Sequence, residues 1–289
     1  MKVDNAIIMA AGTSSRFAPL SYETHKGLIE VRGEILVERQ IRQLREAGIN
    51  DIIIVTGYKA DSFGYLKDKF GVRLIHNPDF LVRNNNSSIH AVREFLSNSY
   101  VCSVDNYFVD NPFSPEVDES YYAAQFSKGD TDEWCMTTDA QDYIDKVTIG
   151  GRDSWYMMGH TFWSRDFSKR FLGILDSVYD LESSRNLLWE DIYIRHLDTL
   201  KMKIRKYRQN DILEFDTLDE LRVFDPSYVM DTRSTILKRL CRELNCNESD
   251  IQNIRTLKSD TNAADGFCFD TASGHYSYRY MSQRLEKAR

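Results

Sequence analysis

The first third of the chain alternates between short runs of consecutive apolar residues and longer segments in which apolar residues recur at helical spacing. A continuous apolar run is typical of a strand buried on both faces, and helical spacing indicates an amphipathic helix. Their alternation predicts a mostly parallel sheet with helices on both faces. We expect strands over 6–10, 51–56, 72–76 and 100–104, and helices over 35–47, 61–70 and the residues leading to about 96.

The pattern becomes rich in strand-forming residues after position 120, where it predicts an antiparallel extension that walls one side of the ligand crevice. Beyond residue 228 the pattern predicts a separate small unit. We therefore expect a large α/β domain over 1–227 and an α+β appendage over 228–289. The extension comprises segments 121–127, 133–138, 143–149 and 154–158, with turns at 130–132 and 150–151. Helices are expected over 165–179, from 187–191 and over 231–244, and strands over 201–205, 251–257, 266–270 and 275–280.

The composition limits the kinds of molecule that we expect this protein to bind. The chain has 37 Lys and Arg against 44 Asp and Glu, a net charge of −7. A negative field repels polyanions, so we expect neither a nucleic acid nor an anionic membrane surface as partner. No apolar run is long enough to span a bilayer, and the run near the N-terminus is too short for a signal peptide. Five cysteines without paired metal-type spacing favour a reducing cytoplasm.

The first strand runs directly into a loop of small residues. The loop reads Ala10-Ala11-Gly12-Thr13-Ser14-Ser15-Arg16, and Lys26 follows ten residues later. Such a loop points backbone N–H groups at one place beyond the strand end, and with two nearby cations it suits a triphosphate. It lacks the Gly-Lys-Ser/Thr of a Walker loop. An ordinary strand followed by a polar turn is the alternative.

Three further segments carry polar side chains that a ligand could contact. Asn85, Asn86 and Ser88 lie in an unusually long Asn/Ser run before a helix, which favours contacts with a base or phosphate over simple capping. Asp105 ends a buried strand, where a carboxylate can bind Mg²⁺, although an Asx turn would also place it there. Glu190 and Asp191 open a later helix, which the helix dipole alone would favour.

The loop, Lys26 and these later segments together resemble the nucleoside-triphosphate transferases, and their order resembles the bacterial CTP:phosphocholine cytidylyltransferases. The resemblance covers about residues 5–225 and implies a Rossmann-like nucleotidyltransferase fold. Two positions depart from the pattern, because Ser14 replaces a glycine and His25 replaces a proline. The matching segments, in order, are Ala10–Arg16, His25–Leu28, Asn85–Ser88, Asp105–Tyr107, Glu133–Trp134 and Trp189–Glu190.

The resemblance also implies roles for individual residues. Arg16 and Lys26 would hold the CTP phosphates, and Asp105 and Glu190 would bind Mg²⁺, with Asp191 as the neighbouring candidate for the second ligand. Trp134 would present an aromatic face to a quaternary ammonium. The family carries an aromatic residue directly before its helix tryptophan, and this sequence has Leu188 at that position. The nucleotide would contact residues 10–15, Asn85, Asn86 and Ser88, and the headgroup Glu133, Trp134, Trp189 and Asp191.

These roles imply transfer of CMP from CTP to phosphocholine with release of pyrophosphate. A 2-aminoethylphosphonate cytidylyltransferase is the main alternative. A sugar-phosphate nucleotidyltransferase fits less well, and an inactive nucleotide-binding module is opposed by the intact charged residues. The tail from Ile254 to Tyr280, including Thr261 and Asn262, is similar to the opening of a choline-kinase N-lobe. We favour a packing appendage over a remnant, a homodimer contact or the start of a longer fusion.

Overall fold

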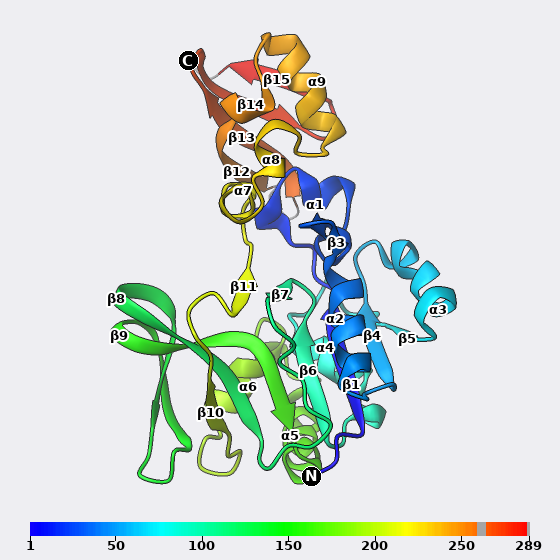
Figure 1. The fold of residues 1–289 in the computed structure, drawn as a ribbon, viewed down its shortest axis with the longest axis vertical. Coiled ribbons are helices and arrows are strands. Elements are labelled where there is room, and N and C mark those ends of the chain that lie inside the picture. Colours follow the sequence, from blue (N-terminus) through cyan, green and yellow to red (C-terminus); the bar gives the residue numbers. More distant parts are fainter. Residues whose placement is uncertain (259–263, 288–289) are drawn as a thin grey trace. The chain divides into compact units, whose positions relative to one another are not determined.

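The computed structural model describes residues 1–258 and 264–287, which form two compact units (Figure 1). The first unit contains Met1–Gly12 and Val37–Leu213, and the second contains Thr13–Leu36 and Glu214–Arg289. Thr261 and Asn262 of the tail pattern lie outside the described residues.

The first unit is built on a seven-stranded mixed sheet with strand order β10-β8-β9-β6-β1-β4-β5. The first four predicted strands all form and pair in parallel, β6 with β1, β1 with β4 and β4 with β5, whereas β9 runs antiparallel to both β6 and β8. The strands are β1 (Asn5–Ala10), β4 (Ile52–Thr56), β5 (Arg73–His76), β6 (Ser99–Ser103), β8 (Tyr121–Thr138), β9 (Ile144–Trp163) and β10 (Lys203–Lys206). A separate small pair joins β7 (Asn106–Phe108) to β11 (Ile212–Glu214).

Both faces of the sheet centre are covered. Ile7 and Ile8 on β1, and Ile53 and Ile54 on β4, are all fully buried. Because successive strand residues point to opposite faces, this pattern requires packing on each side. On one face, Val92 packs with Ile7 and Ile53. The predicted α/β fold with a mixed, mostly parallel sheet is therefore confirmed.

Helices of the first unit differ from prediction mainly in length. The helix expected over 61–70 is divided into the 3-10 turn η3 (Ala60–Phe63) and α3 (Tyr65–Phe70), and the helix before residue 96 into α4 (Asn86–Ala91) and η4 (Arg93–Phe95). α2 (Leu36–Glu46), α5 (Arg165–Val178) and α6 (Trp189–Ile194) form near their predicted positions.

The antiparallel extension corrects the sequence interpretation. The four predicted segments are two long paired strands, β8 and β9, and the expected turns at 130–132 and 150–151 lie inside them. Register shifts occur close to both places, between Ser127 and Asp130 and between Thr131 and Trp134. Irregular pairing of this kind absorbs turn-forming residues without ending a strand. β9 also continues through Trp163, beyond its predicted end.

The C-terminal part of the second unit is a four-stranded antiparallel sheet preceded by three helices. The sheet order is β12-β13-β14-β15, and the fourth strand was not predicted. The N-terminal part, residues 13–36, contains short turns rather than long elements. The bounds are α7 (Leu218–Phe224), α8 (Ser227–Met230), α9 (Thr235–Leu244), η6 (Glu248–Asp250), β12 (Gln252–Lys258), β13 (Ala264–Thr271), β14 (Gly274–Arg279) and β15 (Arg284–Lys287). Earlier come η1 (Ser15–Phe17), α1 (Leu20–Glu23), η2 (Lys26–Leu28), β2 (Glu30–Val31) and β3 (Glu34–Ile35).

The division into compact units differs from a single cut in the sequence. Residues 13–36 group with the C-terminal residues and leave the sheet on which β1 lies. The domain boundary expected at 227–228 marks the end of the family-like sequence and stays a prediction. All five cysteines are free. Within the described residues, no helix is both long and apolar enough to cross a membrane.

Candidate active site

The end of β1 lies between the ends of its two neighbouring strands. Val104 donates from its backbone N–H to the carbonyl of Met9 (3.2 Å), and Tyr58 donates to the carbonyl of Ala11 (3.0 Å). A side chain at Gly57 would come within 2.8 Å of the Ala11 carbonyl, so glycine is needed there. Ala10 and Ala11 are buried and Gly12 is exposed. The predicted loop therefore begins at the carboxyl edge of the sheet, where α/β proteins bind ligands.

Asp105 occupies the turn between β6 and β7 at the same edge. Its carboxylate accepts a hydrogen bond from the Ser103 hydroxyl, and the residue is half-buried. Gln40 on α2 braces the turn, donating to the carbonyls of Ser103 and Asn106 at 2.9 Å each. The turn is thus held by side chains as well as by the strand, which leaves the Asp105 carboxylate in a fixed position.

Glu190 and Asp191 have separate environments although they are neighbours in α6. Asp191 accepts from the backbone N–H of Leu188 (2.7 Å) and so caps the helix. Glu190 accepts from Asn85 (3.1 Å) and from the Tyr122 hydroxyl (3.3 Å). Burial raises the pKa of Glu190 to about 7, because a carboxylate removed from water with only neutral donors loses solvation energy. Glu190 is therefore better suited to a cation than Asp191.

The Asn/Ser run connects α4 with the loop before α6. Asn85 accepts from the backbone N–H of Trp189 (2.7 Å) in addition to donating to Glu190. Asn86 is fully buried and donates to the carbonyls of Ser184 (3.0 Å) and Leu187. Ser88 is buried and accepts from Asn77 (3.2 Å). These bonds give all three residues structural partners, and their contact with a nucleotide stays a prediction.

The aromatic residues predicted at the headgroup site differ in their exposure in the structure. Trp189 is 2% exposed and its ring packs against Tyr122 and Trp163 (centroids 5.7 and 5.0 Å apart), so it offers no open face to a ligand here. Trp134 is half-buried and Glu133 is exposed on β8. The side chain that precedes Trp189 is Leu188, also half-buried. The Trp189 ring therefore packs in the core, and its headgroup role stays a prediction.

In the second unit, the loop that follows Gly12 turns at Ser14. Ser14 has a φ of 48°, in the left-handed region, and its carbonyl accepts from the N–H of Phe17 (2.9 Å). This is the position at which the family-like pattern has glycine, so the serine carries backbone strain that glycine would not. Thr13 and Arg16 are exposed and Ser15 is half-buried.

Arg16 and Lys26 converge on the same carboxylate. Asp216 lies 2.6 Å from the Arg16 guanidinium and 3.5 Å from the Lys26 ammonium. The Arg16 side chain is 74% exposed, whereas that of Lys26 is 3% exposed and lies 5.8 Å from the Phe17 ring centroid. Asp216 was not predicted as a site residue, because Asp216-Thr217 followed by Glu220 has the ordinary pattern of a helix N-terminus, which it also forms. Two cations spaced around one anionic group are suited to a phosphate.

Asp105 and Glu190, here named the carboxylate set, fit a hard divalent cation by donor type. Mg²⁺ is commonly bound by one or two carboxylates together with substrate phosphates. Among residues 1–258 and 264–287, no group of three or more His, Cys, Asp and Glu side chains forms a complete metal cluster. Arg16 and Lys26 are named the cation set.

The fold is that of a nucleotidyltransferase. Residues 6–170 match the profile of the MobA-like NTP transferase domain, and the chain belongs to that family. It is 32% identical over 217 residues to choline-phosphate cytidylyltransferase of Streptococcus pneumoniae, covering 75% of this chain and 95% of that protein. It is 34% identical over 234 residues to 2-aminoethylphosphonate cytidylyltransferase of Lancefieldella rimae, covering 80% and 95%. Within the family, the chain belongs to the cytidylyltransferases.

Solved structures agree with this assignment. The structure of CTP:phosphocholine cytidylyltransferase from Streptococcus pneumoniae matches with a TM-score of 0.75 at 32% identity, covering 78% of this chain and 99% of that one. The inositol-1-phosphate CTP transferase of T. maritima matches with a TM-score of 0.60 at 15% identity, covering 76% and 92%, and shares the fold.

Proposed function

We propose that this chain transfers CMP from CTP to phosphocholine and releases pyrophosphate. The observation that carries the proposal is the convergence of Arg16 and Lys26 on one carboxylate, at 2.6 and 3.5 Å, because it places two positive charges where a single anionic group contacts both. Similarity to the choline-phosphate cytidylyltransferases supports CTP as donor and phosphocholine as acceptor.

The proposed reaction needs no general base. A phosphate oxygen of the acceptor is already anionic near neutral pH and attacks the α-phosphorus of CTP in line. A new P–O bond forms as the bond to the bridging α–β oxygen breaks, and pyrophosphate leaves with that electron pair. Lys26 and Arg16 stabilise the charge that grows on the phosphates. Mg²⁺, held by Asp105 and Glu190 when bound, would supply further positive charge to the phosphates.

A second candidate acceptor is 2-aminoethylphosphonate. Leu188 and the buried Trp189 leave Trp134 as the remaining aromatic candidate for a choline-binding face. A primary ammonium instead prefers carboxylates and hydrogen-bond acceptors, and the exposed Asp132 and Glu133 on β8 could provide them. Similarity to the Lancefieldella rimae enzyme supports this acceptor as well.

Pyrophosphate release across a panel of acceptors tests the proposal. The panel combines CTP or UTP with phosphocholine, 2-aminoethylphosphonate or glucose 1-phosphate, with and without Mg²⁺. We expect turnover with CTP and phosphocholine that requires the metal. Preferential turnover of the phosphonate or the sugar phosphate would replace phosphocholine as the acceptor, and no release with any pair would indicate an inactive nucleotide-binding module.

A substitution at Leu188 sharpens the choice of acceptor. Leu188→Tyr adds a ring beside the headgroup site, so it should lower KM for phosphocholine about fivefold, because an aromatic face attracts a quaternary ammonium by roughly 1 kcal/mol. KM for 2-aminoethylphosphonate should change less. Leu181→Tyr, at an exposed position, is the matched control. Equal effects of both variants on both acceptors would remove Leu188 from the headgroup site.

We also propose a cytoplasmic location, supported by the five free cysteines. A homodimer formed through the C-terminal residues stays a proposal, and sedimentation of the full chain at micromolar concentration tests it. A single monomeric species would exclude it under those conditions.

A further inference from the structure

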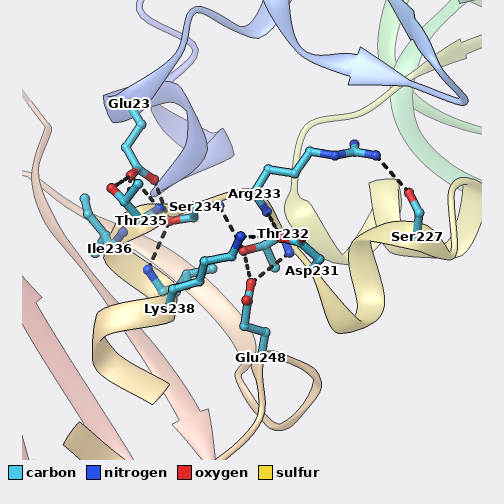
Figure 2. Close-up of polar contacts among 11 residues, drawn as sticks. Glu23, Ser227, Asp231, Thr232, Arg233, Ser234, Thr235, Ile236, Lys238 and Glu248 are labelled. Atoms are coloured by element: carbon cyan, nitrogen blue, oxygen red, sulfur yellow. Dashed lines mark hydrogen bonds and ion pairs between the residues drawn. The ribbon is translucent and has the colours of Figure 1, made fainter. Parts of the chain in front are cut away.

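The segment that carries the cation set obtains its order from residues far along the chain. The Tyr22 ring stacks on that of Tyr280, with centroids 3.8 Å apart and planes at 4°. Figure 2 shows the Glu23 carboxylate directed at the start of α9, where it accepts from the backbone N–H groups of Thr235 (2.8 Å) and Ile236 (3.2 Å). Glu23 thus satisfies two donors that a helix start leaves without intrahelical partners. Tyr22 and Glu23, which make these two contacts, lie between Arg16 and Lys26 in the sequence.

A third contact involves the loop of residues 10–16 that follows β1, here called the phosphate loop. The hydroxyl of Thr256, on β12, donates a hydrogen bond to the backbone carbonyl of Ser15. The carbonyl of Ser15 and the N–H of Arg16 belong to one planar peptide group and point in opposite directions. Holding the carbonyl therefore sets the direction of the Arg16 N–H, one of the loop amides proposed to face the phosphates.

The strand that bears Thr256 is tied to the helix that follows Asp216. Arg222 on α7 donates to the carbonyls of Ile251 and Glu248, both at 2.7 Å, which fixes the entry into β12. Asp216 itself donates from its backbone N–H to Glu220 of α7 (2.7 Å). One connected set of contacts therefore holds the backbone of Ser15 through Thr256 and the side chains of Arg16 and Lys26 through Asp216.

We infer that Thr256 is a positioning residue for the nucleotide phosphates, and that the C-terminal module, residues 231–258 and 264–287, orders the phosphate loop. The inference rests on the proposed function. By this inference the C-terminal module contributes to CTP binding, in addition to packing against the rest of the second unit. Thr256 acts through the Ser15–Arg16 peptide and itself touches no reacting atom.

Steady-state kinetics of Thr256→Val tests the inference, because valine keeps the shape and loses the hydroxyl. We expect KM for CTP to rise about five- to tenfold, the usual worth of one hydrogen bond, with KM for the acceptor within about twofold of the parent. Thr256→Ser keeps a hydroxyl and should restore KM for CTP. Thr271→Val removes a hydroxyl that bonds within the β13–β14 hairpin and serves as matched control.

Tyr280→Leu provides a second probe if Thr256→Val does not fold. Loss of the stack on Tyr22 should also raise KM for CTP, whereas Tyr280→Phe keeps the ring and should not. Unchanged KM for CTP in Thr256→Val, or failure of Thr256→Ser to restore it, would overturn the inference. Failure of the proposed function looks different, since the unmodified chain would then release no pyrophosphate from CTP.

Discussion

The carboxylate set and the cation set are built in different ways. Asp105 follows β6, a strand in the middle of the seven-stranded sheet, and Glu190 lies in the first turn of α6 over the ring-packed core around Trp189. Arg16 and Lys26 lie in η1 and η2, which are three residues each. Turns of that length have no stability of their own.

The difference shows which parts of the structure hold each set of side chains in place. Elements packed into the core of the first unit, together with side-chain hydrogen bonds from Gln40, Asn85 and Tyr122, place the carboxylate set. Side-chain contacts with residues 214–258 and 264–287 place the cation set, so its geometry depends on a few hydrogen bonds and one ring stack. We expect substitutions that disturb the contacts of Arg16 and Lys26 to alter phosphate binding, and substitutions around Asp105 and Glu190 to alter metal use.

The largest expected effect comes from Lys26, which tests whether the cation set acts on the reaction. Lys26→Ala should lower kcat by at least ~10²-fold, because the loss of a donor to charge that develops in the transition state has this magnitude. Pyrophosphate release at saturating CTP measures it. Lys67→Ala, at an exposed position on α3, should keep the parent rate. Near-normal turnover of a folded Lys26→Ala would remove Lys26 from the mechanism.

The next effect separates the two acidic neighbours of α6. Glu190→Gln should lower kcat at least ~10-fold and raise the Mg²⁺ concentration needed for activity. Loss of a residue that only orients a metal ligand already costs about 10-fold or more in metal affinity or activity, so loss of a ligand should cost at least as much. Its thermal stability without metal should not fall, because the buried charge has neutral partners.

Asp191→Asn is the matched comparison for Glu190→Gln. It weakens a helix cap and should cost about 1 kcal/mol of unfolding free energy while the Mg²⁺ requirement is retained. Titration of activity with Mg²⁺ and thermal melts of both variants measure these outcomes. The reverse assignment of effects would make Asp191 the ligand.

A buried histidine gives the first unit a pH dependence of its own. His160 is fully buried against Tyr121 (3.0 Å) and Cys102 (3.6 Å), and burial, aided by the Arg205 charge, lowers its pKa to about 3. Below pH 6.5 the unfolded chain takes up a proton that the native chain does not. The free energy of unfolding should therefore fall with pH below 6.5, by about 2 kcal/mol at pH 5.

Urea unfolding of the parent and of His160→Gln between pH 7 and pH 5 tests this dependence. The parent should lose stability over the interval, and the variant should lose about 2 kcal/mol less, because glutamine does not titrate. Parallel curves for the two proteins would show that His160 does not cause the loss.

The smallest expected effect concerns the strained loop residue. Ser14→Gly should stabilise the second unit by about 0.5 kcal/mol, because relief of the left-handed strain exceeds the added freedom of the unfolded chain. Ser15→Gly lacks that relief and should destabilise by about 0.5 to 1 kcal/mol. Thermal melts measure both. Equal destabilisation by the two variants would show that Ser14 carries no strain.

Much of the first unit could be predicted, and the failures have common physical causes. The strands that contain Ile7, Ile53 and Tyr100 were predicted because a short continuous apolar run is typical of a strand buried on both faces. Turn-forming residues such as Gly150 were misassigned, since long-range pairing with β8 overrides local preference. The burial of Trp189 against Trp163 was not predicted, because no local pattern encodes a contact between separate elements.

The sequence alone determined the α/β fold and nominated the charged residues Arg16, Lys26, Asp105 and Glu190, because strand periodicity and motif spacing are local properties. Only the tertiary structure paired both cations with Asp216, distinguished Glu190 from Asp191 and placed Thr256 against Ser15. Each of these decisions joins residues through contacts between separate elements, and such contacts exist only when the chain is folded.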